Sequence, residues 1–409
     1  MKEISGGVCA PKGFKAGGIR CGIKASATKR DLAIICSEKP CSAAGVFTVN
    51  KARSACVTVS KEHIKDGALQ AVIINSGNAN ACTGEAGVAA AKKMASLGAE
   101  LLKIDPHQVA VASTGVIGVP LPIEKIEQGL KEQGLPLTDN EEGFLQALEA
   151  IMTTDTTKKY AAFELEIDGK KVRLGGMTKG SGMIHPNLAT MLCFITTDAA
   201  VSPQALDTCL RRAAQRSFNR LSVDGDTSTN DMAIVMANGE AGNSIITEGS
   251  GGYEAFAQAL ETLCIRLARE IARDGEGATK LITVTVSGAR DEKTAEILAK
   301  SVVSSSLVKA ACFGADANWG RILCAMGYSG ADFDPEKVDV SFVSVLEGEE
   351  VMVCKDGSAL EFSEDDARRI LGCKELEIRI KAGTGQGNSE AWCCDLTYDY
   401  VKINGDYRS

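Results

Sequence analysis

The sequence lacks the features that insert proteins into membranes or export them. Its 409 residues contain no uninterrupted apolar run of the length, about 18 residues, that a membrane-spanning helix needs. The first residues, MKEISGGVCAPKGFKAGG, carry no apolar stretch of the kind found in secretory signals. We therefore expect a cytoplasmic protein that does not bind a membrane.

An excess of positive charge is also missing. The chain has 45 Lys and Arg against 53 Asp and Glu, which gives a net charge of -8, and no stretch concentrates the basic residues. Because a protein neutralises nucleic-acid phosphates with a dense basic surface, this balance argues against a nucleic-acid partner. Hydrophobic residues make up 44% and charged residues 24%, as in ordinary globular proteins.

Signals for a metal or a disulfide scaffold are weak. The three histidines, His63, His107 and His185, are far apart in the sequence, and no C-x-x-C pair occurs. Fifteen cysteines are scattered through a chain long enough to build its own core, so we expect most of them to be small buried apolar residues. The segment 217–231 holds three aspartates but lacks the glycine and glutamate of a calcium loop. We predict no metal and no bound cofactor.

Strand-like and helix-like patterns alternate irregularly, which predicts a mixed α/β or α+β fold with layered sheets. A hairpin is predicted around Asp168-Gly169. A strand at 281–286 and the turn after it suggest a boundary near residue 285, with a smaller C-terminal unit from about 288 onward. The other predicted strands cover 32–36, 45–49, 56–59 and 71–75, and the helices cover 84–103, 122–133, 141–152, 202–217, 253–273 and 294–303.

The most informative stretch is KGSGMIHPNLATMLCFITTD, residues 179–198. Its first residues form a glycine-rich polar loop, and 191–195 is an apolar run typical of a buried strand. Thr190 stands where the loop enters the strand, so its hydroxyl would be held rigidly and yet be reachable. These are the requirements for a nucleophile.

Cleavage of the Ala189–Thr190 peptide bond would activate Thr190. The new α-amine, with an ordinary pKa of about 7.7–8, could act as the base for the threonine's own hydroxyl. The Thr190 oxygen can reach the Ala189 carbonyl through a five-membered ring, which makes self-cleavage chemically feasible. The plainer interpretation is a strand threonine that caps a loop.

A second motif, ASTGVIG at 112–118, follows a strand-like run. The Thr114 hydroxyl and the Gly115 N–H could stabilise a tetrahedral oxyanion, although an ordinary Ser-Thr-Gly turn fits the pattern as well. A catalytic pair of His185 with Ser181 or Cys193 is a further alternative that sequence proximity alone does not support.

Taken together, the motifs resemble the ornithine acetyltransferase family of arginine biosynthesis, also called glutamate N-acetyltransferase. They occur in the family's order along essentially the whole chain. The stretches are NSGNANACTG (75–84), ASTGVIG (112–118), MTTDT (152–156), KGSGMIHPNLATML (179–192), SFNRLSVDGDTSTND (217–231), RDGEGATK (273–280), GADANWGRIL (314–323) and AWCCDLTYDYVKINGDYRS (391–409).

The resemblance implies a layered αββα fold related to self-processing aminopeptidases. It implies self-cleavage between Ala189 and Thr190, giving an α chain (1–189) and a β chain (190–409) that associate as α2β2. In this scheme 190–287 completes the main layered domain and 288–409 forms the smaller C-terminal unit.

The resemblance also implies an activity. Thr190 would take the acetyl group from N-acetylornithine and pass it to glutamate in a ping-pong cycle, with Thr114 and Gly115 as the oxyanion hole. Acetyl-CoA is a candidate second acetyl donor, which the sequence does not decide. The alternatives are a self-processed N-terminal-threonine amidohydrolase or aminopeptidase with water as acceptor, and a small-molecule binding protein without activity. The implied substrate contacts are Thr153, Lys179, Thr190, Glu276, Asn404 and Ser409.

Overall fold

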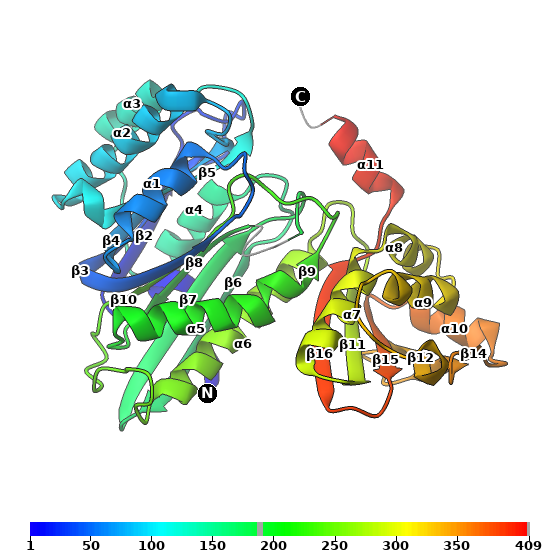
Figure 1. Ribbon diagram of the computed structural model, residues 1–409. Helices are drawn as coiled ribbons and strands as arrows, with labels where there is room; N and C mark the ends of the chain where they lie inside the picture. Colours follow the sequence, from blue (N-terminus) through cyan, green and yellow to red (C-terminus); the bar gives the residue numbers. More distant parts are fainter. Residues whose placement is uncertain (186–190, 407–409) are drawn as a thin grey trace. The chain divides into compact units, whose positions relative to one another are not determined.

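The computed structural model describes residues 1–185 and 191–406, which form two compact units of mixed α/β structure (Figure 1). Unit 1 comprises Met1–Gly180, Asn187–Asn219 and Thr227–Leu267. Unit 2 comprises Ser181–Pro186, Arg220–Asp226 and Ala268–Ser409, and it contains the range 288–409 predicted for a smaller C-terminal unit. The division into chains 1–189 and 190–409 stays a prediction.

Unit 1 is built on a nine-stranded sheet with the order β1-β6-β7-β8-β10-β3-β4-β5, in which β2 also pairs with β3. The long strand β3 serves both halves of this sheet because its register shifts between Cys36 and Cys41. Its first residues pair with β2 and β4, and its last residues pair with β10. The strands are β1 Lys2–Ile4, β2 Phe14–Ile19, β3 Leu32–Phe47, β4 Ala68–Asn78, β5 Val109–Val116, β6 Lys159–Ile167, β7 Lys170–Lys179, β8 Leu192–Thr197 and β10 Met232–Ala237.

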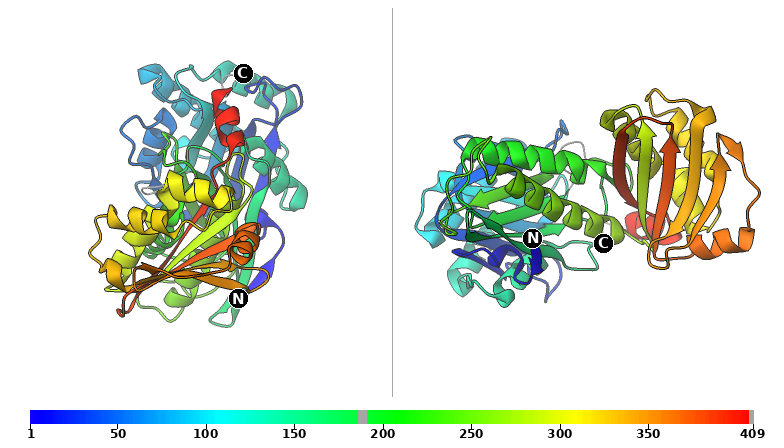
Figure 2. Two further views of the ribbon diagram at one scale, coloured as in Figure 1. Left: turned by 90° about the vertical axis from the view of Figure 1, so that its right-hand side faces the viewer. Right: turned by 90° about the horizontal axis from the view of Figure 1, so that it is seen from below.

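Helices enclose the two halves of this sheet, which confirms the layered arrangement (Figures 1 and 2). Helices α1, α2 and α3 pack on the outer face of the β3-β4-β5 half. Helix α4 contributes to the inner core together with β8 and β10, and α6 packs against Gly176 of β7. The helices are α1 Ala55–His63, α2 Gly84–Leu102, α3 Ile123–Gln133, α4 Glu141–Ile151, α5 Pro203–Arg216 and α6 Tyr253–Arg273, with short 3-10 turns η1 Gly7–Cys9, η2 Pro106–Gln108 and η3 Phe218–Arg220.

Unit 2 contains a seven-stranded sheet with the order β14-β13-β12-β15-β11-β16-β9. Along β15 the apolar residues Leu376 and Ile378 face a core, while Glu377 and Arg379 alternate with them, as expected for a sheet with one covered face. The elements are β9 Leu221–Ser222, β11 Leu281–Ala289, α7 Glu292–Ser304, α8 Ser306–Phe313, α9 Trp319–Gly327, η4 Pro335–Lys337, β12 Val338–Ser344, β13 Glu350–Lys355, β14 Ser358–Ala359, α10 Glu364–Leu371, β15 Glu375–Ala382, β16 Gly387–Cys394 and α11 Tyr398–Gly405.

One predicted strand is wrong. The run 56–59 belongs to helix α1, which Ser54 caps by accepting a hydrogen bond from the Val57 N–H. The β-branched residues Val57 and Val59 favour a strand locally, but their burial against the core decides for a helix. The hairpin around Asp168-Gly169 is confirmed, because it joins β6 and β7 in continuous register.

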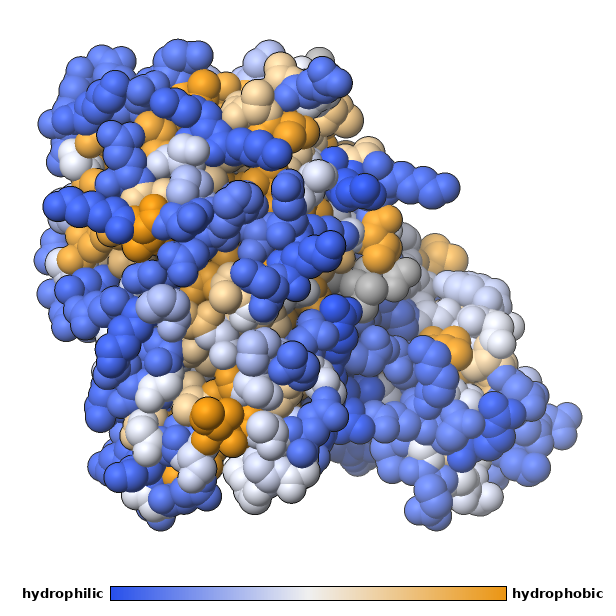
Figure 3. Space-filling view, turned by 60° about the vertical axis from the view of Figure 1, so that its left-hand side comes forward, coloured by the Kyte–Doolittle hydropathy of each residue, from blue (hydrophilic) through white to orange (hydrophobic). Residues whose placement is uncertain are grey.

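The expectation for the cysteines is also confirmed, since all fifteen are free thiols and eleven of them are buried. On the face shown in Figure 3, hydrophilic residues predominate and apolar residues are scattered among them. Within residues 1–185 and 191–406, no helix combines the length and the apolar character required to cross a bilayer.

Candidate active site

The predicted oxyanion residues lie at the end of β5, beside the parallel strand β4. Thr114 is paired with Ser76, and Gly115 with Gly77. The backbone of Gly115 has φ of 133°, and a Cβ at this position would collide with the Gly77 carbonyl carbon. Only glycine fits such a conformation and such a close approach, so local geometry accounts for the glycine that follows Thr114.

Buried amides fix this strand end. Asn230 donates both of its side-chain N–H groups, to the carbonyl oxygens of Ala79 at 2.6 Å and Ser113 at 2.7 Å. The Ser113 hydroxyl donates to Asn75 Oδ1 at 2.5 Å, and Asn75 Nδ2 donates to the Asn78 carbonyl at 2.9 Å. These amides therefore hold the residue before Thr114 in place. Sequence reasoning noted Asn75 and Asn230 only as members of polar stretches and missed this role.

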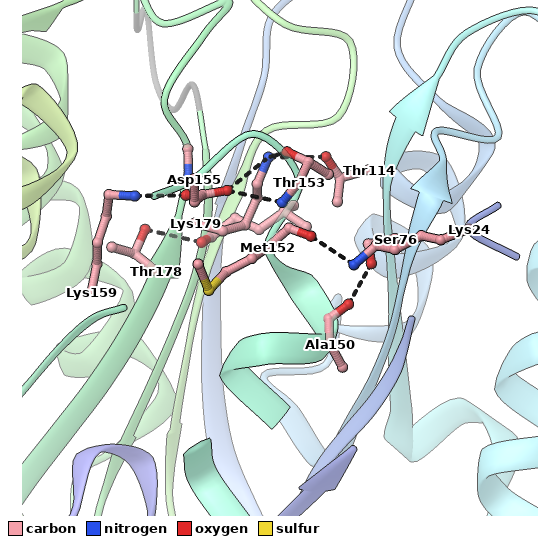
Figure 4. Close-up of polar contacts among 12 residues, drawn as sticks. Lys24, Ser76, Thr114, Ala150, Met152, Thr153, Asp155, Lys159, Thr178 and Lys179 are labelled. Atoms are coloured by element: carbon pink, nitrogen blue, oxygen red, sulfur yellow. Dashed lines mark hydrogen bonds and ion pairs between the residues drawn. The ribbon is translucent and has the colours of Figure 1, made fainter. Parts of the chain in front are cut away.

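The ammonium group of Lys179 contacts two other predicted residues, Thr114 and Thr153 (Figure 4). Lys179 is the last residue of β7, and its Nζ donates to Thr153 Oγ1 at 2.7 Å and to Thr114 Oγ1 at 3.3 Å. A hydroxyl has one proton and two lone pairs, so each threonine can accept from Lys179 and still donate its own proton. The structure thus brings together Thr114, Thr153 and Lys179 in unit 1.

Asp155 lies beside Lys179, and its side chain is fully buried. Its Oδ1 is 2.7 Å from Lys159 Nζ, and its Oδ2 is 4.0 Å from Lys179 Nζ. Burial alone would raise the pKa of Asp155, but Lys179, Lys159 and the Gly180 N–H hold this pKa well below its usual range. The ammonium groups of Lys159 and Lys179 thus both face the Asp155 carboxylate.

The turn that carries Thr153 is tied down on both sides. Lys24 Nζ donates to the Met152 carbonyl at 2.8 Å, and the Ser76 hydroxyl donates to the Ala150 carbonyl (Figure 4). Burial lowers the pKa of Lys24 to about 8, and the nearby Asp31 carboxylate opposes this effect. Sequence reasoning missed Lys24 because its partner is 128 residues away.

A second buried carboxyl group, that of Asp231, immediately precedes β10. Its Oδ2 is buried and has no hydrogen-bond partner among residues 1–185 and 191–406. Burial raises the pKa of Asp231 well above its usual value, against weaker opposing effects of the Ser228 hydroxyl and Lys179. Burial therefore favours the protonated form of Asp231.

The predicted nucleophile, its cleavage partner and the terminal hydroxyl, namely Thr190, Ala189 and Ser409, lie outside the described residues. The apolar run that follows Thr190 in the sequence forms the fully buried strand β8, as predicted. This strand lies between β7 and β10, and the Met232 N–H donates to the Met191 carbonyl at 2.9 Å. On one side of β8, strand β7 therefore ends in Lys179. On the other side, strand β10 begins directly after Asp231.

In unit 2 the structure brings together the other two predicted residues. Asn404 Nδ2 donates to Glu276 Oε2 at 2.8 Å, and the Glu276 N–H donates to the Ser181 carbonyl at 2.9 Å. Gly182 allows this arrangement, because a Cβ there would collide with the Glu276 carboxylate. Glu276 is 7% exposed, so its carboxylate is nearly enclosed and is held by a neutral amide.

The alternative built on His185 receives little support. His185 Nδ1 is 3.0 Å from Ser222 Oγ, and burial lowers the pKa of His185 to about 4, which makes it a weak base. Burial also raises the pKa of Cys193 well above its usual value, so this thiol is not ionised. In the described part of the chain, no group of three or more His, Cys, Asp or Glu side chains could hold a metal ion.

Hydroxyl groups and a glycine N–H at a strand end, next to a buried ammonium group, are the kind of donors with which acyl-transfer enzymes stabilise an oxyanion. Comparison with known proteins gives the family. A model of the ArgJ family matches residues 15–409, so the chain belongs to the ArgJ family, and the resemblance found in the motifs is confirmed.

Relatives share the whole length of the chain. The arginine biosynthesis bifunctional protein ArgJ of Symbiobacterium thermophilum is 53% identical over 410 residues, and that of Caldanaerobacter subterraneus is 51% identical over 409 residues. Each alignment covers 100% of both chains. A solved structure of ornithine acetyltransferase from Mycobacterium tuberculosis, in complex with ornithine, is 40% identical, with a TM-score of 0.43, over 46% of this chain and 99% of that chain.

The buried carboxyl group of Asp231 predicts a pH dependence of stability. An aspartate in the unfolded chain ionises near pH 3.9, at about its reference pKa, whereas burial raises the pKa of Asp231 in the fold. Above pH 3.9 the folded state then binds more protons than the unfolded state, so stability falls as the pH rises toward the pKa of the folded state. Asp231→Asn should remove this loss. The melting temperature of the variant minus that of the wild type should therefore increase from pH 5 to pH 8.

Calorimetry at four pH values measures this difference. The exposed Asp66→Asn in the same unit is the control, for which we expect a constant offset from the wild type. An Asp231→Asn offset that does not change with pH would contradict the raised pKa of Asp231.

Proposed function

We propose that this chain transfers an acetyl group from N-acetylornithine to glutamate through an ester on Thr190. The observation that carries the proposal is the contact of the Lys179 ammonium group with the hydroxyls of Thr114 and Thr153. This contact places a cation that can bind a carboxylate next to two hydroxyl groups, one of them at the end of a strand. The full-length relatives of the chain are named arginine biosynthesis bifunctional proteins.

The first step is self-cleavage. The Thr190 oxygen attacks the Ala189 carbonyl carbon, and the peptide C–N bond breaks as the hydroxyl proton passes to the departing nitrogen. Water then hydrolyses the resulting ester, which restores the Thr190 hydroxyl and leaves a carboxylate on Ala189. The products are an α chain, 1–189, and a β chain, 190–409, whose terminal amine can serve as a base.

The acetyl group then moves in two halves. The Thr190 amine takes the proton of its own hydroxyl, and the oxygen attacks the acetyl carbonyl of N-acetylornithine. The Thr114 hydroxyl and the Gly115 N–H stabilise the tetrahedral oxyanion, and ornithine leaves with the transferred proton on its nitrogen. The amine of glutamate attacks the acetyl-Thr190 ester in the same way, which gives N-acetylglutamate and regenerates the enzyme.

We assign substrate binding to the residues that the family resemblance indicates. The ammonium group of Lys179 is suited to the carboxylates of both substrates, and Thr153 supplies a hydroxyl donor. The carboxylate of Glu276, held by Asn404, is suited to an ammonium group of a substrate. Thr190 and the terminal Ser409 complete the set.

The proposal extends to assembly and donors. The α and β chains would associate as α2β2 in the cytoplasm, and acetyl-CoA would serve as a second acetyl donor, since the relatives are named bifunctional. No cofactor is needed for either transfer, because Thr190 carries the acetyl group itself.

Substitutions of Thr190 test cleavage and transfer together. Thr190→Ala should abolish both, because it removes the only oxygen that attacks in either step, whereas Thr190→Ser should retain part of each. A denaturing gel should show fragments of 189 and 409 − 189 = 220 residues for the wild type, and N-terminal sequencing of the second should read TMLCF. An uncleaved wild-type chain with full transfer activity would refute the cleavage step.

If Thr114 belongs to the oxyanion hole, removal of its hydroxyl should slow the chemical step. Thr114→Val keeps the shape of the side chain but removes the donor, so kcat should fall about 10²- to 10³-fold in cleaved enzyme. Thr114→Ser, which keeps the hydroxyl, is the matched control and should retain most of kcat. Equal kcat values for the two variants would remove Thr114 from the oxyanion hole.

The fate of the acetyl group separates a transferase from a hydrolase. We expect that N-acetylornithine is consumed rapidly only when glutamate is present, and that glutamate is also acetylated from acetyl-CoA. Chromatography of the products with each donor, with and without glutamate, measures both rates. Equally fast consumption without glutamate would favour the hydrolase.

A further inference from the structure

Asp155 contacts residues on both sides of the proposed substrate site. Its Oδ2 accepts from the Thr153 N–H at 3.0 Å and faces the Lys179 ammonium group. Its Oδ1 accepts from the Gly180 N–H at 2.7 Å. We propose that Asp155 is a positioning residue that locks Lys179 and Thr153 into a receptor for the α-carboxylate of an amino-acid substrate. The inference rests on the proposed function.

The contacts of Asp155 reach both halves of this receptor. One carboxylate oxygen fixes the backbone of Thr153 (Figure 4). The other accepts from the N–H of Gly180, the residue directly after Lys179. The Thr153 hydroxyl and the Lys179 ammonium group are then held 2.7 Å apart. A substrate carboxylate has two oxygens at a fixed spacing, so a donor pair held in this way can bind both of them without first being ordered.

Lys159 explains why Asp155 can do this in a buried place. Its side chain is fully buried, and its Nζ is 2.7 Å from Asp155 Oδ1, whereas Lys179 Nζ is 4.0 Å from Oδ2. Lys179 and Lys159 both lower the pKa of Asp155, so together they favour its ionised form against the effect of burial. Lys179 also donates to the two threonine hydroxyls, so it links Asp155 to the proposed receptor.

Removal of Asp155 alone would take a carboxylate away from two buried ammonium groups, which destabilises a fold. The test therefore uses the double variant Asp155→Asn with Lys159→Met. It loses one anion and one cation, so the cluster keeps the same net charge as in the wild type. Lys159→Met alone is the matched control for the loss of the lysine. The pair Asp155→Asn with Lys159→Gln repeats the test with a polar replacement.

In cleaved enzyme, KM for N-acetylornithine should rise about tenfold or more in the double variant, beyond any change in Lys159→Met, because a charge-assisted contact has lost its geometry. The kcat value should change much less. With N-acetylputrescine, which has the same acetamide and amine but no α-carboxylate, kcat/KM should be equal in the double variant and in Lys159→Met. The melting temperatures of these two variants are measured alongside.

Two results would overturn the inference. One is a KM in the double variant that equals that of the wild type or of Lys159→Met, which would mean that charge or packing alone matters. The other is an equal loss with N-acetylputrescine. Glutamate binding, measured by titration calorimetry, provides a readout apart from transfer and should weaken about tenfold or more in the double variant. If the wild type transfers no acetyl group, the proposed function fails, whereas this binding measurement still decides the role of Asp155.

Discussion

The burial of the Lys179 ammonium group is the constraint on which the arrangement of the site depends. A charge removed from water has to be compensated by an opposite charge and by hydrogen bonds, or the fold loses stability. Lys179 meets this requirement with Asp155 and with the hydroxyls of Thr114 and Thr153. The end of β7, the end of β5 and the turn after α4 must therefore meet at one point, and the geometry of the proposed site follows from this meeting.

Strand order provides the framework for that meeting. Strand β8 is buried along its whole length between β7 and β10, and β4 and β5 run parallel, so their carboxyl ends lie at the same edge. Loops at such an edge can carry polar residues because the strands below them are fixed by the core. Asn230 adds a direct link, since it comes from the loop before β10 and binds the carbonyl group of Ser113 in β5.

The sequence predicts what depends on local chemistry and on motif order. The hairpin at Asp168-Gly169, the helix 253–273 and the buried strand after Thr190 all have signals within their own segments. The role of Asp155 could not be predicted, although it stands in a quoted motif, because its partners include backbone groups 25 residues away. The helix at 55–63 was missed for a related reason, since its β-branched residues favour a strand until the cap at Ser54 and the core around them are known.

Asp155 and Asp231, two of the buried carboxyl groups of unit 1, show how the surroundings set the pKa of a carboxyl group. Asp155 is enclosed by two lysines and two backbone N–H groups, which hold its pKa well below the usual range. Asp231 has a buried oxygen without a hydrogen-bond partner in the described part of the chain, and burial holds its pKa far above that range. The surroundings therefore favour the ionised form of Asp155 and the protonated form of Asp231. Lys179 lowers the pKa of both carboxyl groups, but only for Asp155 do the lysines and the backbone N–H groups outweigh burial.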